Sequence, residues 1–329
     1  YKRQVSQGHA VYASDTSFVT LTNSGTEVAR LQLTHSNPVM KNNENRFLTY
    51  GIGSASYEIS SFDETLYSGN AENKIYTGDV ASNGTYCLVT EDNGYLTTLY
   101  AYSKNNNRIY KYSFSEYYIT SVAINKDGSG CVAAGVSSDK GSAVTGVYVL
   151  DFSQEKPVST YKISGDSVLD CKYLTSDTAV LVGSQASYIV KKGEKNYKTV
   201  SYEDKTLSNY CFNTDTSTYT MALSRSGDGR SVALISYNSN GEAQYTINTE
   251  HKADSLSVYK GTVAILDGNV VYGYNQKGDL LYSTNSGTGS KKIVLASDYT
   301  AYILSVNQIR FIDLDSVSSD DTAQTSKQE

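Results

Sequence analysis

One structural unit that recurs at a nearly fixed spacing limits the folds available to this chain more than any other feature of the sequence. Between Tyr118 and Ile163 the sequence contains four short runs of β-branched, aromatic and small apolar residues, with turn residues between them. Asp127 and Gly128 suit the first turn, because glycine adopts positive φ without steric cost. Four short strands in up-and-down order form one blade of a β-propeller, and the stretch therefore predicts such a blade.

The same unit recurs along the chain. Its first strands begin near Ile75, Ile119, Val168, Leu207, Leu256 and Ile293. Their spacing averages about 44 residues, which is in the range typical of propellers and solenoids. Short, nearly continuous apolar runs follow as second strands, as expected where neighbouring blades cover both faces of a strand. Third strands are predicted to begin at residues such as Tyr95 and Val232.

Two further units precede Ile75, and a final group of three strands ends at Leu314. We therefore predict an all-β fold, a single β-propeller of four-stranded antiparallel blades over residues 1–315. Eight blades are preferred, the last one short of a strand. Seven blades are the alternative, if strands from the two termini share one blade and so close an open edge. A two-domain array of β-sandwiches is the competing fold. Residues 316–329 are predicted to be a disordered polar C-terminal tail.

Composition and charge narrow the functional classes. The formal net charge is −6 and the Lys and Arg residues are scattered, whereas binding to a phosphate backbone needs a clustered basic face; we expect no nucleic-acid partner. No apolar run is long enough to span a membrane. The four cysteines are interpreted as small buried core residues, because matching positions in successive blades should lie too far apart for a disulfide.

No motif predicts catalysis, a metal or a cofactor. The three histidines are expected in solvated loops, and no spacing typical of a zinc site or a Ser-His-Asp triad is present. Residues 51–56 are interpreted as a hairpin turn rather than a phosphate loop, and residues 213–217 as a turn rather than a calcium loop. The absence of Trp argues against a quinone-cofactor dehydrogenase. Asp and Glu are spread over many turns, so spacing cannot pair two carboxylates for glycoside hydrolysis.

The remaining candidate is a binding surface. In a propeller the connections from second to third strand and from fourth strand to the next blade share one face. Tyr and Arg are over-represented in interface hot spots. The binding residues predicted on that face are Tyr95, Tyr117, Lys140, Arg225 and Arg230, with Glu91, Glu116, Ser138 and Asp139 beside them.

Four blocks of the sequence resemble one family, at residues 46–53, 81–90, 117–128 and 145–152. It is DUF5711, an uncharacterised family of Gram-positive, mainly clostridial proteins. The resemblance is strongest over Pro38–Val190, and the chain departs from it at Tyr50–Gly53, where the family is expected to carry a Tyr-Asp-x-Gly-Gly type of block. The family brings no catalytic residues.

The resemblance implies a short N-terminal segment and one transmembrane helix, both outside this sequence, followed by an extracellular propeller-like domain. It implies a location at the extracellular face of the cell membrane. Free thiols would then be tolerated in the reducing surroundings of an anaerobe, although secreted proteins usually carry disulfides.

These observations lead to three functional hypotheses. The preferred one is a non-enzymatic extracellular binding or scaffold module, a monomer, whose partner is a protein of the cell envelope or a cell-wall glycan. The alternative is a carbohydrate-active enzyme, hydrolase or lyase, with its site in the central funnel; converging carboxylates, or a Tyr beside a basic residue, would favour it. A third is an assembly factor that adds partner strands to an exposed blade edge.

Overall fold

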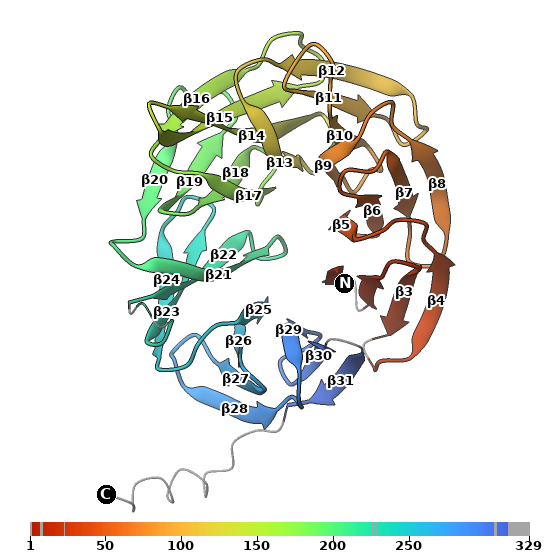
Figure 1. Cartoon of the computed structure of the whole chain (residues 1–329). Coiled ribbons are helices and arrows are strands. Elements are labelled where there is room, and N and C mark those ends of the chain that lie inside the picture. The colour runs from red at the N-terminus through yellow and green to blue at the C-terminus, as the bar shows by residue number, and fades with distance from the viewer. Residues whose placement is uncertain are drawn as a thin grey trace, which may run out of the picture. The chain divides into compact units, whose positions relative to one another are not determined.

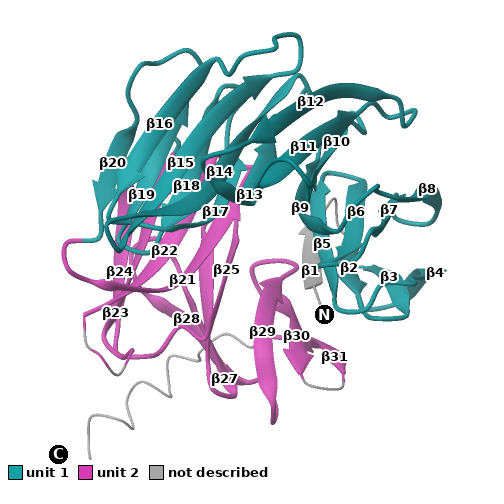
Figure 2. Ribbon diagram, turned by 45° about the horizontal axis from the view of Figure 1, so that its top comes forward, with its two compact units in different colours: residues 1–202, 239–241 teal, residues 203–238, 242–329 magenta. Residues whose placement is uncertain are grey.

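The computed structural model describes residues 2–6, 9–22, 24–225, 227, 229–305 and 308–314. Every element assigned in those residues is a β-strand, and none of them is a helix that could span a membrane. The strands form eight antiparallel sheets, and the fold is an all-β propeller with eight blades (Figure 1). The chain divides into two compact units, residues 1–202 with 239–241 and residues 203–238 with 242–329 (Figure 2).

Unit 1 contains five sheets of four strands each, which follow one another along the chain. The first two sheets are β1 (Lys2–Ser6), β2 (His9–Ala13), β3 (Ser17–Thr22) and β4 (Glu27–Gln32), then β5 (Pro38–Asn43), β6 (Arg46–Gly51), β7 (Ser56–Ser60) and β8 (Thr65–Asn70). The third is β9 (Ile75–Val80), β10 (Tyr86–Thr90), β11 (Thr97–Tyr102) and β12 (Arg108–Phe114). The fourth is β13 (Tyr118–Ile124), β14 (Gly130–Asp139), β15 (Ser142–Asp151) and β16 (Ser159–Ser164), and the fifth is β17 (Val168–Tyr173), β18 (Thr178–Gly183), β19 (Ala186–Lys191) and β20 (Lys198–Ser201).

Unit 2 contains two sheets of four strands and one of three. The sixth sheet is β21 (Thr206–Asn213), β22 (Thr218–Ser224), β23 (Val232–Asn238) and β24 (Ala243–Thr249). The seventh is β25 (Ser255–Tyr259), β26 (Thr262–Asp267), β27 (Val270–Tyr274) and β28 (Leu280–Asn285), and the eighth is β29 (Ser290–Leu295), β30 (Thr300–Ser305) and β31 (Ile309–Asp313).

The strand pairing decides between the predicted blade counts. Within each sheet every strand pairs antiparallel with its neighbour in the chain, and β1 pairs with β2 in the first sheet. In the described part of the chain, no N-terminal strand completes the eighth sheet. The preferred eight blades, with the last one a strand short, are therefore confirmed. The predicted tail at 316–329 lies outside the described residues.

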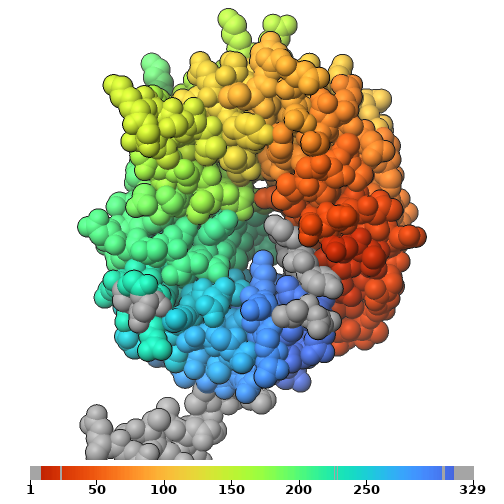
Figure 3. All heavy atoms as spheres, viewed as in Figure 1, coloured from red at the N-terminus to blue at the C-terminus, as the bar shows by residue number. Residues whose placement is uncertain are grey.

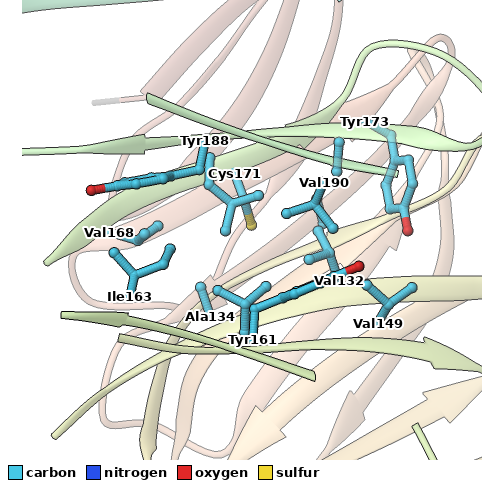
Figure 4. Close-up of a cluster of buried hydrophobic side chains, with 14 of the residues drawn as sticks. Val132, Ala134, Val149, Tyr161, Ile163, Val168, Cys171, Tyr173, Tyr188 and Val190 are labelled. Atoms are coloured by element: carbon cyan, nitrogen blue, oxygen red, sulfur yellow. The ribbon is translucent and has the colours of Figure 1, made fainter. Parts of the chain in front are cut away.

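Apolar cores lie between successive sheets of a unit. Figure 4 shows the core between the fourth and fifth sheets, where Val132 and Ile163 of one sheet face Val168 and Val190 of the other. These four side chains are at most 3% exposed, and burying one such side chain contributes about 1.5–3 kcal/mol. The same packing recurs between other neighbouring sheets, and in the space-filling view the sheets of unit 1 lie side by side in chain order (Figure 3).

Two sequence-based expectations need correction. The third strand of the third sheet begins at Thr97 and not at Tyr95, because the Asp92 carboxylate accepts hydrogen bonds from Gly94 N (2.8 Å) and Thr98 Oγ1 (2.9 Å) and so extends the turn. His35 is not solvated, since only 1% of it is exposed. The cysteines are free thiols as expected, although Cys211 is only partly buried.

Candidate functional site

A group of apolar side chains, here called the tyrosine patch, lies at one end of the third and fourth sheets. Tyr95 and Leu96 are exposed in the β10–β11 connection, Tyr118 is exposed as the first residue of β13, and Tyr76 is a half-buried residue of β9. The exposed fractions are 51% for Tyr95, 42% for Leu96 and 36% for Tyr118. Leu96 N donates a hydrogen bond to Phe114 O (2.9 Å), which places the β10–β11 turn beside the connection that enters β13. The rings of Tyr76 and Tyr118 are 5.1 Å apart.

The hydroxyl group of Tyr118 is uncharged at physiological pH. Partial burial, with the hydroxyl of Tyr76 and the charge of Glu91 also contributing, raises the pKa of Tyr118 to about 12. A neutral tyrosine offers an apolar ring and a hydroxyl that can donate or accept one hydrogen bond. Exposed side chains of this kind are suited to stacking against a sugar ring or the apolar side chains of a peptide.

The other predicted site residues of unit 1 have different positions. Tyr117 is half-buried, and its ring packs over the backbone of Gly146 and 6.1 Å from the ring of Tyr148, so it supports the fold more than it offers a contact. Lys140 is exposed at the tip of the β14–β15 hairpin, with φ of 52°. That hairpin has two strands of 10 residues and runs three residues beyond Val136, which pairs with Tyr118.

The predicted arginines belong to unit 2, in the connection between β22 and β23, where residues 226 and 228 are not among those described. Arg225 is exposed. Arg230 lines a pocket of about 620 Å³ together with Glu250, His251, Lys252, Asp254, Asp267 and Gly268.

Most polar groups of that pocket are already used within the protein. The Asp254 carboxylate accepts a hydrogen bond from Gly268 N (2.9 Å), and Asp267 accepts one from Lys252 N (3.2 Å). The His251 ring is stacked on Tyr272, with 3.5 Å between ring centroids. The pocket is therefore a polar hollow whose carboxylates mainly hold its own loops together.

A second polar group, the first-strand cluster, was not predicted from the sequence. It consists of Lys41 on β5, Tyr50 on β6, Asp79 on β9, and Asp170 and Lys172 on β17. Lys41 Nζ lies 3.2 Å from Asp170 Oδ1, and Lys172 Nζ lies 3.8 Å from Asp79 Oδ2. Asp79 is 1% exposed, and its Oδ1 has no hydrogen-bond partner in the described part of the chain. Lys41 and Asp170 are 129 positions apart in the sequence, so no local motif could have predicted their contact.

The charges of this cluster support one another. Burial alone would lower the pKa of Lys41, but Asp170 and then Asp79 more than offset that effect, and the pKa is raised. Burial raises the pKa of Tyr50, and Lys41 offsets only part of that change. Lys41 is therefore a cation and Tyr50 a neutral phenol at physiological pH. The sequence signal that could have found the cluster is the presence of charged residues inside otherwise apolar first strands.

His35 forms the third polar group, near the start of β7. Its Nδ1 lies 2.9 Å from Ser56 Oγ, and its Nε2 lies 3.7 Å from Glu58 Oε1. Burial lowers the pKa of His35 and raises the pKa of Glu58, so both groups are driven toward their neutral forms. The arrangement of Ser56, His35 and Glu58 resembles a serine nucleophile, its histidine base and a carboxylate that orients the base.

The adjoining loop, however, lacks what an acyl-transfer site requires. Such a site needs backbone N–H groups that point at the developing oxyanion. Here Gly53 N donates to Ile75 O, Ser54 N donates to Gly51 O, and Ser56 N donates to Ser54 Oγ. The three donors are occupied, and residues 51–56 form the hairpin turn predicted from the sequence. Among the described residues no group of His, Cys, Asp and Glu is arranged to hold a metal ion.

Solved structures similar to this chain share its fold at low sequence identity. BamB from Moraxella catarrhalis matches with a TM-score of 0.58 and 11% identity, over 94% of this chain and 92% of that one. Apo AztD from Citrobacter koseri matches with a TM-score of 0.61 and 9% identity, over 89% of this chain and 88% of that one. Sqt1 from Chaetomium thermophilum, bound to the N-terminus of the ribosomal protein L10, matches with a TM-score of 0.60 and 10% identity, over 93% of each chain.

The sequence comparisons assign the chain to a family. A search of curated proteins finds no significant match. The model of one protein family matches residues 2–314, which is nearly the whole described propeller. This confirms the resemblance noted from the sequence blocks. The chain belongs to the family of unknown function DUF5711.

Proposed function

We propose that this chain is a non-enzymatic binding module of the cell envelope, which presents the tyrosine patch to a cell-wall glycan or an envelope protein. The observation that carries the proposal is the exposure of Tyr95 and Leu96 in the β10–β11 connection and of Tyr118 at the start of the neighbouring strand β13. Rigid aromatic side chains lose little conformational entropy on binding, which makes them efficient contacts. The extracellular location rests on the family resemblance described above.

Two further considerations support a binding role. The long β14–β15 hairpin extends past the patch and could contact the same ligand with Asp139 or Lys140. Among the similar structures, Sqt1 is bound to the N-terminus of another protein, which is a precedent on this fold for holding a polypeptide segment. A fold hosts many functions, so the exposed patch and not the fold supports the proposed binding role.

The test is a thermal-shift screen of the purified chain against cell-wall fragments and oligosaccharides, with envelope extracts as the source of protein partners. A ligand at 100 times its Kd stabilises the fold by about 2.7 kcal/mol. We expect the shift to disappear in the double variant Tyr95→Ser/Tyr118→Ser. It should persist in Tyr299→Ser, a matched control because Tyr299 is a tyrosine of unit 2 that is 46% exposed. A shift that survives the double variant would refute the patch as the binding site.

The second candidate function is a carbohydrate-active enzyme, hydrolase or lyase, that uses the first-strand cluster. It is favoured by two carboxylates, Asp79 and Asp170, that both lie near Lys41. It is ranked second because Asp79 and Tyr50 are 1% and 2% exposed, whereas a catalytic group has to reach the substrate.

An activity assay separates the two functions. The chain would be incubated with cell-wall glycans and uronate-containing polysaccharides, and the release of reducing ends and of unsaturated products would be measured. The enzyme hypothesis requires turnover that Asp170→Asn abolishes and that Tyr95→Ser/Tyr118→Ser leaves intact. The binding proposal predicts no turnover by any of the three proteins.

A further inference from the structure

The eighth sheet differs from the other seven because it has three strands. β31 pairs with β30 from Leu304 opposite Ile309 to Thr300 opposite Asp313. In the described part of the chain nothing pairs with the other edge of β31. A free edge of this kind presents a row of backbone N–H and C=O groups that can receive another strand.

The side chains of β31 are more exposed than those of the other third strands. In each of the seven four-stranded sheets the third strand has at least three buried residues, as in β19, where Ala186 to Val190 are all buried. In β31 none of the five residues is buried. Ile309, Phe311 and Ile312 are half-exposed although they are apolar. The rings of Phe311 and Tyr302 form a T-shaped pair with 5.2 Å between their centroids, and Ile312 packs partly against the core between the seventh and eighth sheets.

The complete sheets show what kind of strand fits there. Six of the seven fourth strands place a large apolar or aromatic side chain against the core, and β20 is the exception, with Val200 as its only apolar residue. The residues that do so include Tyr67, Tyr110, Tyr161, Ile163, Ile247 and Tyr282. Residues 315–329 contain no aromatic residue and no Leu or Ile, so they lack the side chains that six of the seven fourth strands supply.

We propose that the outer edge of β31 receives an extended segment of another polypeptide as the fourth strand of the eighth sheet. The segment runs antiparallel to β31, as β24 does to β23 and β28 to β27. It is polar at alternate positions and places a Tyr, Phe or Ile over Phe311 or Ile312. This is recognition by β-augmentation, in which main-chain hydrogen bonds supply affinity and alternate side chains supply specificity. The surface belongs to unit 2, whereas the tyrosine patch belongs to unit 1.

The first experiment uses peptides copied from the chain's own fourth strands. Fluorescein-labelled peptides with the sequences of β24 and β28 would be titrated with the whole protein, and their anisotropy would be measured. We expect saturable binding that is at least about tenfold weaker for one of two β24 peptides that carry Pro at Tyr245 or at Thr246, because adjacent N–H groups point to opposite edges of a strand and Pro removes the ladder donor in only one of the two peptides. Failure of both unsubstituted peptides to bind, or undiminished binding of both proline peptides, would overturn the proposal.

The second experiment completes the sheet covalently. Residues 321–327 would be replaced by the sequence of β24 in one variant and by a scrambled version in the control. The account predicts a higher Tm for the first variant alone, together with loss of peptide binding. An unchanged Tm would contradict it.

Two further measurements test whether the chain's own residues 315–329 or a second copy of the chain occupies this edge. Removal of residues 315–329 should leave the Tm and peptide binding unchanged. A lower Tm with stronger peptide binding would show that the chain covers this edge itself. A dimer in light scattering that dissociates on adding the β24 peptide would identify a second copy as the occupant. Either result would overturn the assignment to a different polypeptide.

Discussion

The first strands of the two units bind their neighbouring sheets in different ways. In unit 1, Asp79 of β9 accepts a hydrogen bond from Ile124 N of β13 (3.0 Å) and lies near Lys172. In unit 2, Ser255 and Ser257 of β25 accept hydrogen bonds from β29 at 3.2 and 2.9 Å. The same link between sheets is thus made by a buried charge in one unit and by neutral hydroxyls in the other.

The difference teaches that the fold does not require charge at this position. A serine satisfies the backbone donor without the desolvation penalty of a buried carboxylate, and a buried ion pair often contributes no more than an apolar replacement. The charges of unit 1 are therefore candidates for a second task, such as contact with a ligand or selection of one strand arrangement. Substitutions at Asp79 and at Ser257 would separate the energetic consequences of the charged and the neutral link.

The largest effect is expected at Asp79. Replacement by Ala leaves Lys172 without its nearest carboxylate and Ile124 N without its acceptor, and breaking a buried pair in this way costs about 3–5 kcal/mol. Urea denaturation of Asp79→Ala beside the wild type would measure the loss. A loss below about 1 kcal/mol would mean that solvent reaches the cluster.

A smaller effect is expected for the neutral link in unit 2. Ser257→Ala leaves the buried Leu295 N–H without its acceptor, and an unsatisfied buried donor costs about 1–3 kcal/mol. The same denaturation series would place this variant between Asp79→Ala and the wild type. If Ser257→Ala were the more damaging of the two, the comparison between charged and neutral links would fail.

An ion pair between the fourth and fifth sheets gives a pH-dependent effect. Lys192 Nζ lies 2.7 Å from Asp151 Oδ2, and this hydrogen bond, with those from Ser153, lowers the pKa of Asp151 from 3.8 to about 2. Because the folded pKa is the lower one, the stabilisation is present above pH 4 and is lost as the pH falls toward 2. Lys192 is 35% exposed, so screening limits the contribution to about 1 kcal/mol.

The measurement is the difference in urea midpoint between wild type and Asp151→Asn. We expect a lower midpoint for the variant at pH 7 and equal midpoints near pH 2. A difference that stays constant over this range would show that ionisation of Asp151 has no part in it.

The smallest effect is expected for a surface pair. Lys162 and Asp139 lie 3.1 Å apart, and their side chains are 54% and 55% exposed. Exposed pairs contribute about 0.2–1 kcal/mol or nothing, so Lys162→Ala should lie within about 0.5 kcal/mol of the wild type. A cost above 1 kcal/mol would indicate that the β14–β15 hairpin depends on this contact.

The sequence was sufficient for the fold because the repeat is a local pattern. Each Asn-Gly or Asp-Gly turn and each short apolar run can be read within a few residues, so the strand beginning at Val168 could be placed correctly. The start of β11 was misplaced because Asp92 extends the turn by side-chain hydrogen bonds, which composition does not reveal.

The candidate site was harder to predict from the sequence than the fold, because its residues come from different sheets. Tyr95 was predicted and lies in the tyrosine patch, but Tyr118 was assigned only to a strand, and its exposure depends on the packing of its neighbours. Lys41 and Asp170 meet across 129 positions. His35 was expected in solvent, and its burial follows from the contact with β7 that no local spacing indicates.

Hydrogen exchange of the whole chain, with and without a ligand found in the thermal-shift screen, tests the central claim most directly. If the tyrosine patch is the binding site, the ligand should slow exchange in peptides that cover residues 91–98 and 115–121 and leave the rest unchanged. Protection confined to residues 250–268 would assign binding to the pocket of unit 2. Protection confined to residues 39–50 and 168–173 would assign it to the first-strand cluster, and either result would contradict the account.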